Sequence, residues 1–547
     1  MRAGQMVIEL LRAEGVTHVF GLVGATTNSI LSEMHGRTDI RFIDARHEQG
    51  AAFMAYGFVR ASGRPAVCLT TAGPGASNML TGIALAYKGQ APVIALAGSW
   101  GLDHEYRDGF QTFDLVTMFK PVTKLSLQVN KTRRLPELFH HAFRTALTGK
   151  PGPVFLDIPK DLLEGQTVGE EVLPPEAYRV TNTRIDGDPK AIEHAVTILA
   201  DAQRPMMLVG GGVIDSEASK EAVDLAELLD MGIVPSYGHN DAVPNSHALY
   251  VGPPGRRGCP EAAEAMRKAD VILALGTRIS QLTSQWAPGF VDPKARIVQV
   301  EIDAQEIGRN YPVAVGILGD AKAVTQQLLE ALRRRYPEGI SRPDWRAEID
   351  RLVISRRDRL EAEARLAGMP IKAQRVYREL AKVLPRDCMV TIDAGITAGL
   401  GYDRLHFEEP RTFFTYAHQG GVGMGYCVGL GTKLGRPDRA AVSISGDGSF
   451  LLNSQEINTA VRWRIPLVHI VLNNGCWGAE KAHQKRAYDG RYVGVDIANP
   501  RFDKLAEVYG ARGFYVERPD EIGVVIREAL SINVPSVIEI PVEEDLP

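Results

Sequence analysis

Residues 443–477 read SISGDGSFLLNSQEINTAVRWRIPLVHIVLNNGCW, and this stretch decides the fold. An apolar strand is predicted over 441–444 before the turn GDGS, and a second over 467–472 before the turn NNG. A helix is predicted between them, because apolar residues recur at helical spacing. Its apolar face is formed by Leu451, Leu452, Ile457, Ala460 and Val461. A crossover of this kind makes the two strands parallel, so we expect Asp447 and Asn474 to converge at one sheet edge.

The two turns supply ligands that a hard divalent cation prefers. The carboxylate of Asp447 and the amide oxygen of Asn474 suit Mg²⁺ or Ca²⁺, with phosphate oxygens completing the coordination shell. Gly446 and Gly448 let the backbone approach a diphosphate, and the helix after Ser449 directs its N-terminus toward it. An ordinary tight turn with an Asx turn is the alternative, and it would be preferred for GDG alone. The NNG turn after a second buried strand argues against that alternative.

The composition indicates a multidomain globular protein with no nucleic-acid or membrane partner. The chain has 547 residues, 45% hydrophobic and 23% charged, and this length suggests three domains. A net charge of −4 gives no electrostatic reason to expect nucleic-acid binding. No apolar run is long enough to cross a bilayer, and the amphipathic start of the chain lacks a signal peptide's apolar core. The five cysteines form no CxxC pair and suggest reduced thiols, so we expect a cytoplasmic protein.

Strands alternate with helices along the whole chain, and this alternation predicts an α/β protein with three doubly wound parallel-sheet domains. We expect the domains at 1–170, 190–335 and 370–547, with a polar linker over 165–189 and a charged helical linker over 344–365. The middle domain contains GGGV and GTR after predicted strands, but ordinary βα turns explain both better than a nucleotide site does. The similar size and alternation of the first and third domains suggest distant copies of one module.

Glu48 stands where a predicted strand over 40–45 gives way to a helix, in the sequence RHEQGAAFMAYGFVRASG. Ligands of doubly wound sheets bind at the carboxyl ends of strands, and Glu48 lies at such an end. A solvated carboxylate favoured by the helix dipole is the alternative, and it would be preferred for Glu48 alone. Together with the GDG and NNG turns, the position favours a functional carboxylate.

The GDG–NNG pair and the motifs RHEQGAA, TAGPGASN and GFQTFDLVTMFKPVTK resemble the acetolactate synthase-like thiamine diphosphate enzymes, and the resemblance covers essentially the whole chain. It implies a pyrimidine-binding first domain, a middle domain, and a third domain that binds diphosphate and Mg²⁺. The implied cofactors are thiamine diphosphate and Mg²⁺, with the metal held by Asp447, Asn474 and the main-chain carbonyl of Cys476. The resemblance also implies a homodimer or homotetramer whose active sites are shared between subunits.

The resemblance further implies roles for single residues. Glu48 would be catalytic, because a carboxyl group hydrogen-bonded to the aminopyrimidine favours the imino tautomer, whose nitrogen removes the C2 proton of the thiazolium. Met424, or else Val422, would be the apolar wedge that keeps the cofactor bent. The expected cofactor-binding residues are Glu48, Thr397, Gly420, Val422, Met424, Gly446, Asp447, Gly448, Ser449 and Asn474.

Within this family, four further segments resemble sulfoacetaldehyde acetyltransferases: YGHNDAVPNSHALYVGP, KADVILALGTR, VGILGDAKAV and NNGCWGAEKAHQ. The implied reaction converts sulfoacetaldehyde and phosphate to acetyl phosphate and sulfite. An acetolactate synthase-like carboligase or 2-oxoacid decarboxylase is the alternative, and a flavin-dependent 2-oxoacid oxidase is a third hypothesis. The substrate would be a small, anionic carbonyl compound. The polar residues expected near it are His47, Gln111, His418 and Lys481.

Overall fold

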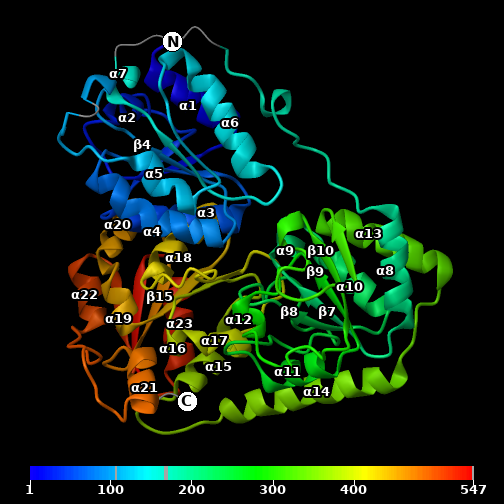
Figure 1. The fold of residues 1–547 in the computed structure, drawn as a ribbon. Helices are drawn as coiled ribbons and strands as arrows, with labels where there is room; N and C mark the ends of the chain where they lie inside the picture. The colour runs from blue at the N-terminus through cyan, green and yellow to red at the C-terminus, as the bar shows by residue number, and fades with distance from the viewer. Residues whose placement is uncertain (105–106, 165–170, 545–547) are drawn as a thin grey trace.

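The computed structural model describes residues 1–547 apart from 105–106, 165–170 and 545–547, and apart from the side chain of Thr397. Three parallel sheets follow one another along the chain, which confirms the predicted α/β architecture (Figure 1). In the first and third domains, apolar clusters lie on both faces of the sheet, so both are doubly wound. The first six residues of the predicted linker over 165–189 lie outside the described part.

The N-terminal domain has a six-stranded sheet in the order β2-β1-β3-β4-β6-β5. The strands are β1 (His18–Gly21), β2 (Arg41–Asp44), β3 (Ala66–Thr70), β4 (Val93–Ala97), β5 (Leu125–Gln128) and β6 (Val154–Asp157). The helices are α1 (Ala3–Ala13), α2 (Asn28–Ser32), α3 (Glu48–Ser62), α4 (Pro74–Lys88), α5 (Leu115–Phe119), α6 (Leu135–Leu147) and α7 (Lys160–Leu163). Helices α1 and α6 pack on one face, and α3 and α4 pack on the other.

The middle domain has a five-stranded sheet in the order β11-β10-β9-β7-β8. The strands are β7 (Pro205–Val209), β8 (Gly232–Pro235), β9 (Val271–Leu275), β10 (Arg296–Glu301) and β11 (Val315–Leu318). The helices are α8 (Pro189–Asp201), α9 (Gly211–Asp215), α10 (Ser219–Leu228), α11 (Pro260–Lys268), α12 (Gln281–Ser284) and α13 (Ala321–Arg335). The charged linker forms α14 (Pro343–Glu363), close to its predicted bounds.

The C-terminal domain has a six-stranded sheet in the order β13-β12-β14-β15-β17-β16. The strands are β12 (Met389–Ile392), β13 (Phe413–Phe414), β14 (Ala441–Gly446), β15 (Val468–Asn473), β16 (Arg512–Tyr515) and β17 (Ser536–Pro541). The helices are α15 (Ala373–Val383), α16 (Ile396–Gly399), α17 (Gly401–Arg404), α18 (Met424–Gly435), α19 (Asp447–Leu451), α20 (Ile457–Trp463), α21 (Gly478–Ala487), α22 (Phe502–Val508) and α23 (Ile522–Ser531).

The segment after GDG differs from the single helix that was predicted. It forms α19, a 3-10 turn over Ser454–Glu456, and then α20. Asn453 and Glu456 are 1% and 0% exposed at this break, whereas Leu452 of the predicted apolar face is 49% exposed. The cause is a tertiary contact, because the side chain of Asn453 donates a hydrogen bond to the carbonyl oxygen of Gly423 at 2.9 Å. Local hydrophobic periodicity carries no information about such a bond.

The N-terminal domain lies directly on the C-terminal domain, where α3 packs against α18 (Figure 1). Small residues bring the two helices into backbone contact. A side chain at Gly57 would collide with the main chain of Val428, and one at Gly431 would collide with the main chain of Met54. Buried residues of both helices belong to one continuous apolar cluster. The interface therefore depends on shape and apolar burial.

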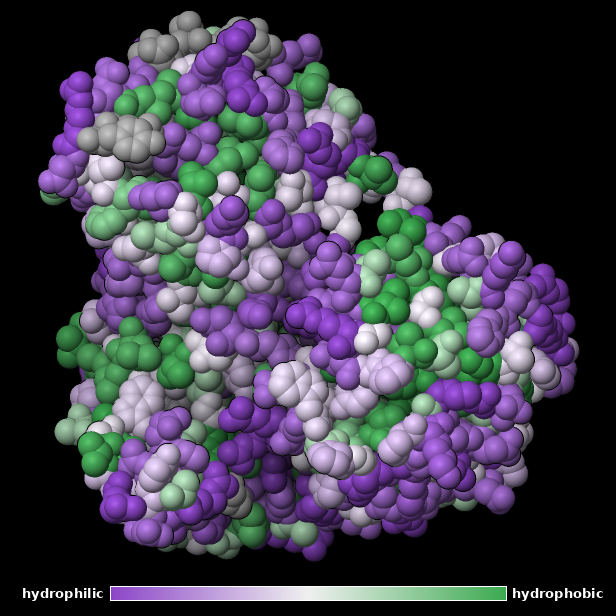
Figure 2. Space-filling model, viewed as in Figure 1, coloured by the Kyte–Doolittle hydropathy of each residue, from purple (hydrophilic) through white to green (hydrophobic). Residues whose placement is uncertain are grey.

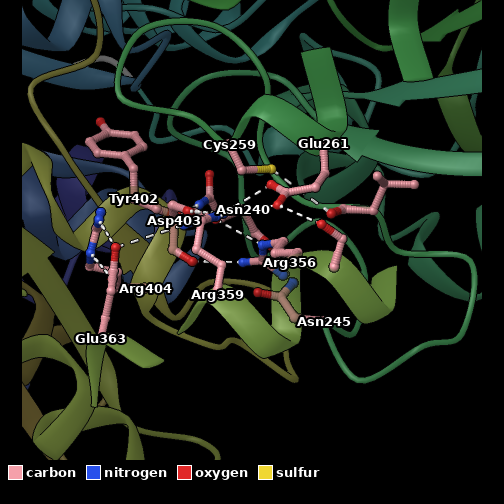
Figure 3. A network of polar contacts seen from close by, with 12 residues as sticks. Asn240, Asn245, Cys259, Glu261, Arg356, Arg359, Glu363, Tyr402, Asp403 and Arg404 are labelled. Atoms are coloured by element: carbon pink, nitrogen blue, oxygen red, sulfur yellow. Dashed lines mark hydrogen bonds and ion pairs between the residues drawn. The ribbon is translucent and has the colours of Figure 1, made fainter. Parts of the chain in front are cut away.

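A buried ion-pair network joins the middle domain to the C-terminal domain through α14 (Figure 3). Arg356 donates a hydrogen bond to Asp403 at 2.8 Å, and their side chains are only 7% and 2% exposed. Arg359 pairs with Asp403 at 2.7 Å and with Glu261 of α11 at 3.0 Å. The network also borders Gly252, where an added Cβ would lie 2.8 Å from the Arg356 Nε atom. Removing one partner would leave a buried charge unpaired, so the network fixes the relative position of the two domains.

The surface divides into polar and apolar regions. Polar residues cover the lower right of the molecule along α14, and apolar residues gather at the left edge of the C-terminal domain (Figure 2). In the part of the chain that the structure describes, no helix combines the length and apolar character needed to span a membrane.

Candidate active site

The two turns that were predicted to converge lie side by side. β14 and β15 are neighbouring parallel strands, so Asp447 and Asn474 emerge at the same sheet edge. Asp447 is 1% exposed. Its carboxylate accepts hydrogen bonds from the backbone N–H of Gly448 at 2.9 Å and from the side chain of Asn499 at 2.7 Å. Asn499 follows neither turn, and no local motif marked it as a partner of Asp447.

A cavity of about 310 Å³ opens at this edge. The predicted site residues that line it are Gly420, Val422, Gly446, Asp447, Gly448, Ser449, Asn474 and Cys476. The middle domain contributes Arg256 and Arg257, and the start of α21 contributes Gly478, Ala479 and Glu480. Among the described residues, none from the N-terminal domain lines this cavity.

The cavity fits a cation and a diphosphate. The side-chain nitrogen of Asn474 is buried and has no hydrogen-bond partner among the described atoms. Amide nitrogen and oxygen are assigned from their partners, so the reversed amide would place an oxygen ligand at that point. Gly395 and Gly420 have φ angles of +136° and +76°, and an added Cβ on either would meet no atom within 4 Å. Their backbone therefore borders open space that a diphosphate could occupy.

The donor set suits a metal that binds oxygen. Burial raises the pKa of Asp447, and a bound cation would oppose this by favouring the carboxylate. Burial also raises the pKa of Cys476 to about 11, so its thiol stays neutral and its main-chain carbonyl is the available ligand. Within the described ranges, no cluster of three or more His, Cys, Asp or Glu side chains could hold a metal ion. The candidate ligands beside Asp447 are instead an amide oxygen and a main-chain carbonyl. The turn is closely packed at Gly448, since an added Cβ would lie 2.8 Å from the side chain of Ile497.

Asp393 fixes the start of α18, a role that the sequence patterns did not indicate. Its carboxylate accepts hydrogen bonds from the N–H groups of Gly423 at 3.1 Å and Gly425 at 2.8 Å. Burial raises the pKa of Asp393 to about 7. Met424 is fully buried, whereas Val422 is 37% exposed and lines the cavity. Of the two wedge candidates, Val422 is the one that reaches the cavity, and the wedge role stays a prediction.

Glu48 begins α3 at the edge of the N-terminal sheet and is 9% exposed. Its carboxylate accepts a hydrogen bond from the side chain of Asn78 at 3.0 Å. Gly75 of α4 lies close by, with an added Cβ only 3.3 Å from the carboxylate. Glu48 does not line the cavity beside Asp447. The structure therefore places the two predicted halves of the site on separate sheet edges of one chain.

Two of the predicted substrate residues lie on the Glu48 side. His47 is the N-cap of α3, and its Nδ1 accepts a hydrogen bond from the N–H of Gln49 at 3.1 Å. Gln111 has a φ angle of +58°. It lies against Gly73, since a Cβ added to Gly73 would be 2.8 Å from Gln111. Thr397, predicted to contact the diphosphate, lies in α16, and its side chain is outside the described part.

The other two predicted substrate residues lie elsewhere. The Nε2 atom of His418 is 3.0 Å from the hydroxyl of Ser280, in a small pocket between the domains. Burial lowers the pKa of His418 to about 4, so the ring is neutral at pH 7. Lys481 forms ion pairs with Asp496, at 2.5 Å, and with Glu544. Neither residue lines the cavity beside Asp447.

Three family models match the chain in order. The N-terminal TPP binding domain of thiamine pyrophosphate enzymes matches residues 1–118, and the central domain matches residues 192–328. The C-terminal TPP binding domain matches residues 393–540 and includes the cavity beside Asp447. Thiamine pyrophosphate is the same compound as thiamine diphosphate.

Full-length relatives carry two kinds of name. A probable acetolactate synthase large subunit of Methanocaldococcus jannaschii is 35% identical, over 99% of this chain and 92% of its own length. A sulfoacetaldehyde acetyltransferase of Castellaniella defragrans is 33% identical, over 100% of this chain and 94% of its own length. An acetolactate synthase large subunit of Haemophilus influenzae is 35% identical, over 97% of this chain and 93% of its own length. The fold, the cavity and these matches show that the chain belongs to the thiamine pyrophosphate enzyme family.

Proposed function

We propose that this chain is a thiamine diphosphate- and Mg²⁺-dependent acetyltransferase that acts on sulfoacetaldehyde. Sulfoacetaldehyde and hydrogen phosphate would give acetyl phosphate and hydrogen sulfite. The C–S bond breaks, and a bond forms between the aldehyde carbon and a phosphate oxygen. The aldehyde hydrogen leaves as a proton, and the methylene carbon gains a proton to become a methyl group. The atoms balance without an external oxidant or reductant.

Two adjacent arginines carry this proposal. Arg256 and Arg257 line the cavity beside Asp447 and, among the residues that the structure describes, are its only contribution from the middle domain. Burial, together with the charge of Arg256, lowers the pKa of Arg257, so the site holds two like charges close to each other. An oxyanion with several acceptor oxygens would relieve this repulsion, and guanidinium groups bind such groups through paired hydrogen bonds. Phosphate and the sulfonate of sulfoacetaldehyde both have this chemistry.

The loop that carries the arginines is held rigidly. Arg257 has a φ angle of +62°, a left-handed conformation that is uncommon for a residue with a side chain. The N–H of Arg256 donates a hydrogen bond to the carbonyl of Leu282 at 2.9 Å. The side-chain stem of Arg257 lies over α16, where an added Cβ on Gly399 would be 3.2 Å from it. Arg356 of the buried network borders the start of this loop at Gly252. Strained backbone of this kind is typical of ligand-binding loops.

Within the proposal, Asp447, Asn474 and the main-chain carbonyl of Cys476 hold Mg²⁺. The backbone of Gly395 and Gly420 faces the diphosphate, and Val422 or Met424 supports the pyrimidine. When bound, thiamine diphosphate supplies a nucleophilic carbon and an electron sink. Glu48 donates or accepts a proton at the pyrimidine ring through its carboxyl group, which Asn78 orients. Arg256 and Arg257 orient the anionic substrate.

We further propose that the active unit is at least a dimer with shared sites. The separation of Glu48 from the cavity beside Asp447 supports this, because one cofactor must reach both groups. The side chains of Phe110 and Phe113, in the loop after β4, are 76% and 59% exposed, as expected if a partner subunit covers them. A two-fold dimer would bring the Glu48 edge of one chain to the Asp447 edge of the other.

A cytoplasmic location is supported by the five free, buried cysteines.

An acetolactate synthase-like carboligase is the second candidate function. It is favoured by the 35% identity to the probable acetolactate synthase large subunit of Methanocaldococcus jannaschii and to the acetolactate synthase large subunit of Haemophilus influenzae. The same cofactor residues would serve both reactions, so the choice depends on the groups that receive the substrate. The planar carboxylate of a 2-oxoacid needs only one guanidinium fork, whereas the paired arginines match a tetrahedral oxyanion better.

A substrate panel with the holoenzyme tests the proposal. Purified protein loaded with thiamine diphosphate and Mg²⁺ is given sulfoacetaldehyde with phosphate, pyruvate alone, or other 2-oxoacids. We expect sulfite and acetyl phosphate to form together, and only when both sulfoacetaldehyde and phosphate are present. Acetolactate from pyruvate without sulfite from sulfoacetaldehyde would replace this proposal with the carboligase. Visible flavin absorbance of the purified protein, with 2-oxoacid oxidation, would favour an oxidase instead.

A further inference from the structure

Glu456 lies at the break between α19 and α20, and its side chain crosses from the C-terminal domain to the N-terminal domain. The residue is completely buried. Its carboxylate accepts hydrogen bonds from the N–H of Arg46 at 2.9 and 3.1 Å and from the N–H of His47 at 2.9 Å. The hydroxyl of Thr459 donates a further bond at 2.6 Å. These donors favour the charged form of the carboxylate, but burial outweighs them and raises the pKa of Glu456 to about 7.

The residues that Glu456 holds come directly before Glu48. The backbone N–H groups at the start of a helix lack partners within the helix, and a negative charge there is stabilising. Glu456 therefore fixes the N-cap residue of α3 and the residue before it. The fit is close, because an added Cβ on Gly50 would lie 2.6 Å from the Glu456 carboxylate. A side chain at position 50 would therefore displace the carboxylate from its present place.

Asn453, at the same break between α19 and α20, contacts the start of α18. The side chain of Asn453 donates hydrogen bonds to the carbonyl of Gly423 at 2.9 Å and to the side chain of Gln49 at 3.3 Å. Gly423 is the N-cap of α18. Four residues, 453–456, thus connect the turn that carries Glu48 with the turn that precedes Met424. Neither connection is needed to join the domains, since α3 and α18 already pack through their glycines.

We infer that Glu456 is a positioning residue, which holds the first turn of α3 so that the carboxyl group of Glu48 is correctly aimed at the cofactor. The inference rests on the proposed role of Glu48. Residues that orient a catalytic group must hold it within a fraction of an ångström, and small displacements cost large factors in rate. Glu456 acts through two backbone N–H groups and does not line the cavity beside Asp447.

The test measures proton exchange at the C2 carbon of the bound cofactor, because this step needs no substrate. Holoenzyme with thiamine diphosphate and Mg²⁺ is diluted into D₂O, quenched with acid, and examined by proton NMR. We expect Glu456→Gln to slow exchange about 10- to 100-fold, with cofactor affinity and melting temperature close to wild type. The matched control is Glu507→Gln, which removes an exposed carboxylate of the same domain and should exchange at the wild-type rate.

A double mutant separates positioning from general loosening. Glu48→Gln alone should slow exchange more than Glu456→Gln, and the double variant should be no slower than Glu48→Gln, because both act on one group. Wild-type exchange in Glu456→Gln would overturn the inference. If Glu456→Gln does not fold, Gly50→Ala decides the question, since it keeps the carboxylate but displaces it from Arg46 and His47. Fast exchange in wild type without turnover of any substrate would refute the proposed reaction and leave this inference standing.

Discussion

The N-terminal and C-terminal sheets have the same topology but carry different chemistry. Their strand orders, β2-β1-β3-β4-β6-β5 and β13-β12-β14-β15-β17-β16, are identical when strands are counted from the start of each domain. In this correspondence α3 matches α18, and these are the two helices that pack on each other. The loop after β14 supplies Asp447, whereas the equivalent loop after β3 has the sequence TAGPG. The helix α3 instead begins with Glu48, where α18 begins with Met424.

Under the proposed function, this difference would divide one reaction between two sheets of the same topology. The C-terminal copy offers oxygen ligands and open glycine backbone, which suit a metal and a diphosphate. The N-terminal copy offers a single carboxyl group among small residues, which suits proton transfer at an aromatic ring. Loss of the oxygen ligands should prevent binding of the cofactor and the metal. Loss of the Glu48 carboxyl group should prevent turnover.

The largest effect is expected for Asp447→Ala. The variant should lose cofactor and metal binding together, and with them all activity, because the remaining amide and carbonyl ligands carry no charge. Calorimetry with thiamine diphosphate and Mg²⁺ measures this directly. Asp438→Ala, at an exposed position of the same domain, is the control and should bind normally. Unchanged affinity in Asp447→Ala would mean that the metal lies elsewhere.

Glu48→Gln should separate turnover from binding. We expect the fold, the oligomer and cofactor affinity to persist, while kcat falls about 10²- to 10⁴-fold, because an amide cannot exchange a proton as a carboxyl group does. Steady-state kinetics and calorimetry on the same preparation give both quantities. A loss of cofactor binding equal to that of Asp447→Ala would show that the two copies do not divide their tasks.

A smaller effect is expected for Arg257→Gln, in which the cofactor groups stay intact. The KM for phosphate or for sulfoacetaldehyde should rise about 10- to 100-fold, as for the loss of a hydrogen bond between charged groups. The substrate whose KM rises identifies the oxyanion that the pair binds. Arg333→Gln, on the surface of α13, is the control. Weaker cofactor binding with unchanged KM values would instead place the arginines at the diphosphate.

The smallest effect concerns pH and stability. Burial raises the pKa of Asp393 to about 7, above its ordinary value of about 3.9. The folded state therefore binds this proton more tightly than the unfolded state, and stability falls as pH rises from about 4 to 7. Asp393→Asn should flatten the fall in unfolding free energy across this range. Parallel pH profiles for wild type and variant, measured by denaturant unfolding, would contradict the assignment.

Sequence patterns predicted the parallel architecture and the convergence of Asp447 with Asn474, because both follow from local strand and turn signals. They failed where a residue acts on a distant backbone. The break at Asn453 depends on a bond to Gly423, and Glu456 has its partners in another domain. The loop with Arg256 and Arg257 contains no motif, and only the folded chain places it beside the turns that carry Asp447 and Asn474.

Mixed dimers test the central claim, that each site is built from the N-terminal copy of one chain and the C-terminal copy of another. Glu48→Gln chains and Asp447→Ala chains, each inactive alone, are mixed in equal amounts and allowed to exchange subunits. Half of the dimers should then be heterodimers with one intact site of two, so about a quarter of wild-type activity should return. No recovery of activity after verified subunit exchange would show that each site is built within one chain.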